Sequence, residues 1–305
     1  MAKKSKRGSG PRPGSNRAER VAARRARQEA ALEAPARPFG GLAAECDLVA
    51  LRAFVASATA TLELASTPAD GRSIVLGTVL PGAVPGIVRE TDGAPQAFVA
   101  TQTDPEPADV AVGLASAITW ATTAAVGSDF ADAGDPAPLT DLLVADAVLD
   151  ITVHDDFGWW LHPGAAVTPE VGQMLQRAND TILPTARLTN DSGIGAPWWV
   201  DAGERAHLRW VRPEPEDDLM SALARIHAAG NLTLGEGSRF AGSFRTHGLL
   251  VPVFDLDAER HPTEWTQALN TFDAHLVEAL ADTSDLTAAQ RRSRDGIRGR
   301  QVTLR

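Results

Sequence analysis

The residues best suited to bind a ligand lie in one strip of the sequence, LGEGSRFAGSFRTHGLLVPVFDL (residues 234–256). Arg239, Arg245 and His247 are hydrogen-bond donors in an otherwise acidic body, and Asp255 follows them. Arg245 and His247 would share one face of a strand, because side chains on a strand alternate with a period of two. The strip therefore predicts a pocket for an anion or a peptide carboxylate. The competing interpretation is a surface strand whose arginines pair with local acids.

Two pairs of adjacent tryptophans are the second unusual pattern: Trp159 and Trp160 in HDDFGWWLHPG, and Trp198 and Trp199 in IGAPWWVDAG. Both segments predict β-hairpins. Neighbours on a strand point to opposite faces, so one ring of each pair should pack inward and the other should need a cover. We expect the two hairpins to lie together at a lobe junction and to cover each other's outer ring. The alternative is a surface that binds a protein partner.

The acids and histidines of the chain do not have the spacing of a known metal motif. One presumed hairpin carries His154, Asp155, Asp156 and His162. No H-E-x-x-H or similar pattern occurs, and Asp255 with Asp257 is interpreted as the polar end of a strand. The segment GEGSRFAG (235–242) has Phe240 where a dinucleotide loop has its third glycine. We therefore expect no metal and no cofactor.

Lysine and cysteine usage excludes further classes of enzyme. All lysines lie in KKSK (residues 3–6), so the rest of the chain has no P-loop lysine, no kinase lysine and no lysine for a Schiff base. The single cysteine, Cys46, excludes an intramolecular disulfide and is interpreted as a small buried hydrophobe. This usage fits a reducing cytoplasm, where we expect the protein to reside.

The net charge of −10 is divided unevenly along the chain. Residues 1–40 carry a net +8, residues 290–305 a net +5, and residues 41–289 a net −23. Basic ends of this kind can contact the phosphates of RNA or DNA, and the alternative is that they are solvated or fold back on the acidic body. The predicted contacts are Lys3, Lys4, Lys6, Arg7, Arg24, Arg25, Arg291 and Arg292.

Hydrophobic periodicity predicts an α+β protein with two related lobes. The order helix, three strands, helix (αβββα) is expected in residues 47–124 and again in 216–280, with antiparallel sheets and with the tryptophan hairpins between the two units. The uncharged window 110–127 is interpreted as a packed helix, so no contact with a membrane is expected.

The expected organisation has four parts. Residues 1–40 form a disordered basic tail with an Ala/Arg helix, residues 41–190 and 191–284 form the two α+β lobes, and residues 285–305 form a basic C-terminal helix or tail. Both basic ends are expected to be flexible. Thr287 and Gln290 have the spacing of a capping box at the start of the last helix.

Three longer strings carry a family resemblance: GLAAECDLVALRAFV, LARIHAAGNLTLGEGSRFAGSFRTHGLLVPVFDL and RRSRDGIRGRQVTLR. They resemble an uncharacterised actinobacterial protein family of unknown function. Some members borrow the name of the secretion ATPase SecA, a label that the missing P-loop lysine does not support. The resemblance implies relatives and no reaction, so it assigns no catalytic residue.

The leading functional hypothesis is a non-enzymatic protein-binding module, either an adaptor or a chaperone-like protein with an unknown protein partner. The order of elements in the first lobe is similar to that of small secretion-chaperone-like folds, which is an analogy of fold only. The first alternative is association with RNA or the ribosome through the basic ends. The second is an enzyme with a site around Arg245, His247 and Asp255.

Overall fold

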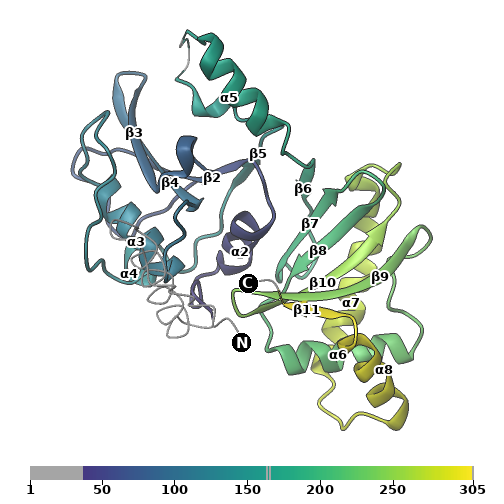
Figure 1. Ribbon diagram of the computed structural model, residues 1–305. Helices are drawn as coiled ribbons and strands as arrows, with labels where there is room; N and C mark the ends of the chain where they lie inside the picture. The colour runs from purple at the N-terminus through teal and green to yellow at the C-terminus, as the bar shows by residue number, and fades with distance from the viewer. Residues whose placement is uncertain (1–36, 163, 165, 304–305) are drawn as a thin grey trace, which may run out of the picture.

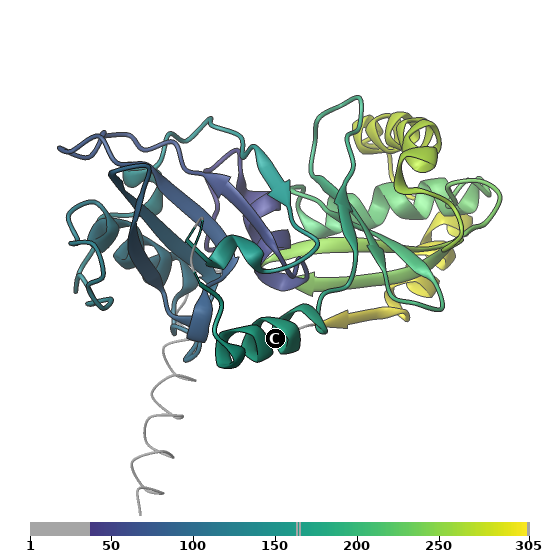
Figure 2. The same cartoon turned by 90° about the horizontal axis from the view of Figure 1, so that it is seen from above.

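The computed structural model describes residues 37–162, 164 and 166–303 (Figure 1). They form two β-sheets with helices packed on them, so the fold is α+β, as the sequence predicts. The first sheet has five strands in the order β3-β4-β2-β1-β5, and the second has six in the order β11-β9-β10-β8-β7-β6. The two sheets lie at opposite ends of the molecule in both views (Figures 1 and 2).

The first sheet is antiparallel except between β2 and β4. Its strands are β1 (Ala58–Thr61), β2 (Ile74–Val79), β3 (Gly86–Thr91), β4 (Ala94–Gln102) and β5 (Ile151–Val153). Helices α3 (Val110–Ala121) and α4 (Leu139–Leu142) contribute to the core on one of its faces. The short 3-10 turns η1 (Pro81–Ala83) and η2 (Gly158–Trp160) lie in its connections.

The second sheet is antiparallel except at its last strand, β11, which runs parallel to β9. Its strands are β6 (Thr185–Arg187), β7 (Ala196–Asp201), β8 (Ala206–Val211), β9 (Ser238–Thr246), β10 (Leu249–Leu256) and β11 (Gln301–Thr303). One face packs against α6 (Glu216–Ala228) and α7 (Thr266–Ala281), which η3 (Pro262–Trp265) precedes. Helix α8 (Ala288–Arg298) packs against α6.

Helix α2 (Glu45–Ala53) lies between the two sheets (Figure 1). Its buried residues Leu48 and Val49 belong to one core with Leu76 of the first sheet and with Trp198 and Val251 of the second. One short helix thus completes the apolar core on facing surfaces of both sheets. Strand β6 already pairs with β7, so the second sheet begins before residue 191, where the sequence places the lobe boundary.

The strand count differs from the repeated αβββα pattern. The first unit has four strands between α2 and α3. The additional strand is β3, which pairs with β4 across a tight turn at Asp92 and Gly93, both with positive φ. The second unit has two strands between α6 and α7. The segment LTLGEG (residues 232–237), where the sequence predicts a strand, lies before β9 and contains a turn. Gly235 and Gly237 in it have positive φ, a conformation that strands do not use. The predicted duplication is therefore not supported at the level of strands.

Two helices begin at a threonine whose side chain caps the first turn. Thr168 caps α5 (Pro169–Asn179), with its side chain accepting from the Val171 amide at 3.4 Å. Thr287 and Gln290 form the predicted capping box at the start of α8. The C-terminal segment is more regular than a flexible tail, because α8 packs on α6 and β11 completes the sheet edge.

The uncharged window contains α3, where Leu114 and Ile118 are buried in the first core. A packed helix is the predicted arrangement. Within the described residues, no helix combines the length and the hydropathy needed to cross a bilayer.

Substitution of Gly86 tests how α3 packs on the first sheet. A Cβ atom at this position would lie 2.7 Å from the Trp120 indole of α3. Gly86→Ala should lower the free energy of unfolding by about 2 kcal/mol, because overpacking forces strain on the neighbours. Urea denaturation measures this. The matched control is Gly296→Ala in α8, where a Cβ meets nothing within 4 Å and stability should be unchanged or higher. Equal midpoints for the two variants would contradict this packing.

Candidate functional site

The structure separates the residues of the predicted anion pocket. Arg245 is exposed on β9 and pairs with Glu216 at the start of α6. His247 lies in the β9–β10 turn with φ 47°, and its ring centroid is 6.2 Å from that of Phe39. The strand ends before His247, so the argument from strand period fails and the two side chains do not converge. The expected convergence of Arg245 and His247 is not seen, and an enzymatic site around Arg245, His247 and Asp255 stays a prediction.

Arg239 and Asp255 do meet, as cross-strand partners on β9 and β10. Arg239 Nη2 lies 2.5 Å from Asp255 Oδ2, while Arg205 Nη1 and His207 Nδ1 each lie 3.2 Å from the same carboxylate. Burial raises the pKa of Asp255, but the hydrogen bond from Arg239 and the nearby positive charges outweigh it, so the net pKa is lowered. Arg239 thus pairs with a local acid, as the competing interpretation of the strip expects. Ligand binding by Arg239 and Asp255 stays a prediction.

Asp257, the second acid of the D-x-D pattern, accepts a hydrogen bond from the Glu259 amide at 3.0 Å. Across the described part of the chain, no group of three or more His, Cys, Asp or Glu side chains is arranged to hold a metal ion.

The first tryptophan pair is not on a hairpin. Trp159 and Trp160 belong to η2, which follows a turn closed by Asp156 Oδ1 and the Gly158 amide at 2.7 Å. The Trp159 indole donates to Ser57 Oγ and the Trp160 indole to the Val79 carbonyl, both at 2.9 Å. Both rings are half-buried and fix the turn against the first sheet, so the alternation of faces expected of a strand does not apply to them.

The second pair does show the predicted alternation on β7. Trp198 packs in the core that contains α2, and Trp199 packs in the core of the opposite face with α6 and α7. Both rings are buried, so neither presents a partner surface in this structure. The cover over Trp198 comes from α2, and no ring contact joins the two pairs among the described residues. The predicted contact between the pairs is therefore wrong, although Trp198 does lie where the two sheets meet.

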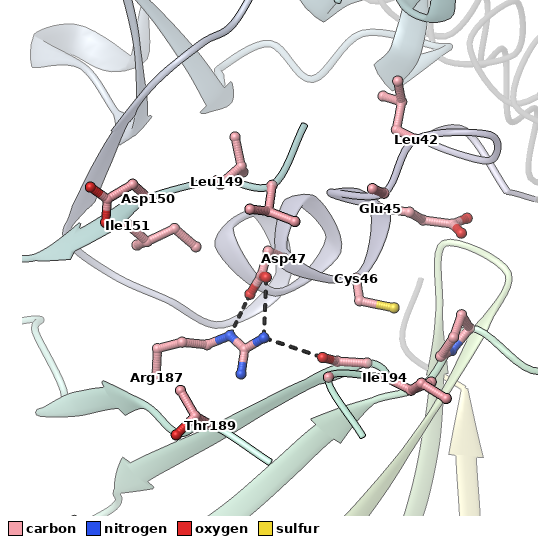
Figure 3. A pocket seen from close by; sticks show the side chains of 15 residues that line it. Leu42, Glu45, Cys46, Asp47, Leu149, Asp150, Ile151, Arg187, Thr189 and Ile194 are labelled. Carbon is pink, nitrogen blue, oxygen red and sulfur yellow. Dashed lines mark hydrogen bonds and ion pairs between the residues drawn. The ribbon is translucent and has the colours of Figure 1, made fainter. Parts of the chain in front are cut away.

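A pocket of about 600 Å³ opens at this meeting of the two sheets (Figure 3). It is lined by α2, by the segment entering β5 and by the loop between β6 and β7. Arg187 on β6 binds both oxygens of Asp47 on α2, at 2.7 Å and 3.2 Å, and also donates to the Gly195 carbonyl at 3.2 Å (Figure 3). Two of the charged side chains of the pocket, Asp47 and Arg187, thus join α2 to the second sheet.

The other reactive groups of this pocket are also restrained. Glu45 is buried and accepts from Arg37 Nε at 2.9 Å. Burial and the neighbouring carboxylates of Glu45 and Asp47 raise the pKa of the Cys46 thiol to about 12, so it stays protonated and is a poor nucleophile. No histidine is among the residues that line the pocket. The pocket therefore offers binding contacts and lacks an activated nucleophile–base pair.

A buried polar network holds the loop that forms one wall of this pocket. Asp273 of α7 accepts from the Ser192 amide at 2.9 Å, from Ser192 Oγ at 3.0 Å and from Asn190 Nδ2 at 3.1 Å. Arg212 is fully buried, donates to the Ile194 carbonyl at 2.9 Å and pairs with Glu214. The sequence gives no signal for this network, because it joins residues from three distant segments.

Helix α5 is the least buried helix of substantial length in the described residues, with none of its 11 residues buried. Val171, Met174, Leu175 and Ala178 follow the spacing of one apolar face. Exposed fractions are 40% for Met174 and, beside the helix, 52% for Val167 and 44% for Leu183. The helix projects from the rest of the molecule at the top of Figure 1.

The predicted nucleic-acid contacts are mostly outside the described residues. Lys3, Lys4, Lys6, Arg7, Arg24 and Arg25 lie in the region 1–36, which the structure does not describe. Arg291 and Arg292 are exposed on α8, where Arg291 donates to the Leu286 carbonyl. Their contact with nucleic acid stays a prediction.

Acid should destabilise the protein through His247. Burial lowers the pKa of His247 from 6.5 to about 4, with Arg52 lowering it further and Glu106 opposing. The unfolded chain then binds a proton that the folded chain does not, so stability is full above pH 6.5 and falls as pH decreases toward 4. Between pH 7 and pH 5 this group should remove about 2 kcal/mol. His247→Asn, which tolerates the positive φ, should lose less stability over that range in urea titrations. Equal losses in variant and parent would contradict the assignment.

Comparison with known proteins identifies a family without assigning an activity. The family model described as a family of unknown function (DUF5926) matches residues 38–305. No curated protein and no solved structure matches the chain. The expectation of an uncharacterised family is confirmed, and the chain belongs to the DUF5926 family of unknown function.

Proposed function

We propose that this chain is a non-enzymatic protein-binding module, an adaptor that uses the apolar face of α5 to contact its partner. The observation that carries the proposal is an amphipathic helix of 11 residues without a single buried residue. An apolar helix face is normally covered by a core, and an exposed one commonly marks a protein-binding surface.

The chemistry of α5 suggests the kind of partner. Val171, Met174, Leu175 and Ala178 have the i, i+3, i+4, i+7 spacing of helices that bind in an apolar groove. Within the helix, one acid, Glu170, and one base, Arg177, leave no net charge. Recognition would therefore depend on apolar contact. We propose that this face of α5 binds in an apolar groove of a different protein.

The restraint of the reactive groups elsewhere is consistent with a binding function. The Cys46 thiol is kept protonated, and Glu45 and Asp47 are held in ion pairs with arginines. Groups committed to such pairs stabilise the junction of the sheets and are poorly placed for proton transfer.

The test compares capture of a partner by two matched double variants of the tagged full chain. Met174→Gln with Leu183→Gln removes exposed apolar groups at α5. Val112→Gln with Val277→Gln removes groups of similar exposure, 48% and 42%, from α3 and α7. A stoichiometric partner from the source-cell lysate should be retained by the control pair and lost by the α5 pair.

Two results would overturn the proposal. One is equal capture of the same partner by both double variants, and the other is a parent chain that captures nothing and is monomeric by light scattering. A parent dimer that the α5 pair converts to monomers would identify a second copy, not a different protein, as the occupant.

A further inference from the structure

The face of the first sheet that points away from α2 carries a second pocket, of about 370 Å³. The register places Phe98, Val75 and Thr61 in one row across β4, β2 and β1. The same pairing continues to Asp150, the residue before β5, because Ala60 pairs with Ile151. Cross-strand partners point to the same face, so this row forms the floor of the pocket.

Trp159 closes one side of the pocket. Its indole lies on Gly77, where a Cβ atom would approach to 2.7 Å, and it stacks near Phe98 with ring centroids 6.3 Å apart. The glycine thus leaves room for the ring to rest on the sheet. Together with Val75, the two aromatic rings give the pocket an apolar end.

Arg89 lies at this end and has no carboxylate partner among the described residues. Its Nη1 donates to the carbonyls of Trp159, Trp160 and Leu161, each at 3.1 Å, and the guanidinium lies 4.2 Å from the centre of the Phe98 ring. Its Nε is buried without a hydrogen-bond acceptor. The side chain is thereby held in place, and its Nη2 has no hydrogen-bond partner among the described residues. A fixed guanidinium with such a donor can bind a carboxylate.

Asp150 lies at the opposite edge of the sheet. It is exposed, forms no ion pair with any other described residue, and lies at the sheet edge where it lines both this pocket and the pocket beside α2. Four strand spacings separate it from β3, which carries Arg89, and this is roughly 19 Å between backbones. Between the two charges the floor carries the hydroxyl groups of Thr59, Thr61 and Thr152.

We propose that this pocket binds the zwitterionic form of a short peptide. The ligand carboxylate binds Arg89, its ammonium group binds Asp150, and the threonine hydroxyls contact the peptide amides between them. An extended chain spans about 3.5 Å per residue, so after allowance for the two side chains a ligand of two or three residues fits the gap. A free amino acid is too short to reach both charges. This site is independent of the α5 surface.

Isothermal titration calorimetry on the full chain tests the proposal, with trialanine as the probe. Trialanine should bind, while alanine, C-amidated trialanine and N-acetylated trialanine should bind at least about fivefold more weakly, because each lacks one ion pair or the required length. Absence of trialanine binding, or equal binding of the free and blocked peptides, would overturn the proposal.

Two variants assign the contacts. Asp150→Asn should weaken trialanine about fivefold and should leave the N-acetylated peptide unaffected, since that peptide has no ammonium group. Asp155→Asn, an exposed carboxylate outside the pocket, is the matched control and should change neither.

Arg89→Gln should weaken trialanine at least about tenfold with little effect on the C-amidated peptide. Because Arg89 also holds η2, thermal unfolding must show a folded variant; if it does not fold, the Asp150→Asn result decides alone. An Asp150→Asn variant that binds trialanine like the parent would refute the site.

Discussion

The arrangement of the whole molecule depends on the burial of α2 between two sheets. Leu48 and Val49 each remove apolar surface from water, worth roughly 1.5–3 kcal/mol per side chain. Their neighbours include Trp198 and Val251, which would otherwise be exposed on the second sheet. Without this helix the second sheet would lose the cover over this face, and the first sheet would keep only the part that α3 and α4 supply. The two halves therefore share one core, and the Asp47–Arg187 pair adds a directional contact at the same place.

Elements with strong local signals could be predicted from the sequence. Thr168 with Pro169 and the Thr287–Gln290 box locate two helix starts, because capping depends on neighbouring residues only. The β7–β8 hairpin was found from its alternation. The turn at Gly158–Trp160 could not be predicted from the sequence, because a tryptophan pair beside a strand resembles a second strand. Its conformation is set by contacts with Ser57 and Val79, which are distant in sequence.

The candidate sites were harder to predict than the fold, because they too depend on contacts between residues that are distant in sequence. Arg245 and His247 are close in sequence, but the turn at His247 sends their side chains to different neighbours. Arg89 and Asp150 are far apart in sequence, and only the strand order brings them to one face. Composition predicts which chemistries are absent. It could not show which charged groups are already paired within the fold, and pairing decides which of them can bind a ligand.

The stacking of His154 on Trp159, with ring centroids 5.7 Å apart, has an optical consequence. Burial lowers the pKa of His154, so its ring is neutral at neutral pH. Its Nε2 lies 2.8 Å from Oγ1 of Thr59, which lines the second pocket. A protonated imidazole quenches indole emission, whereas a neutral one does so weakly. Protonation of His154 in acid would therefore dim the emission of the Trp159 indole.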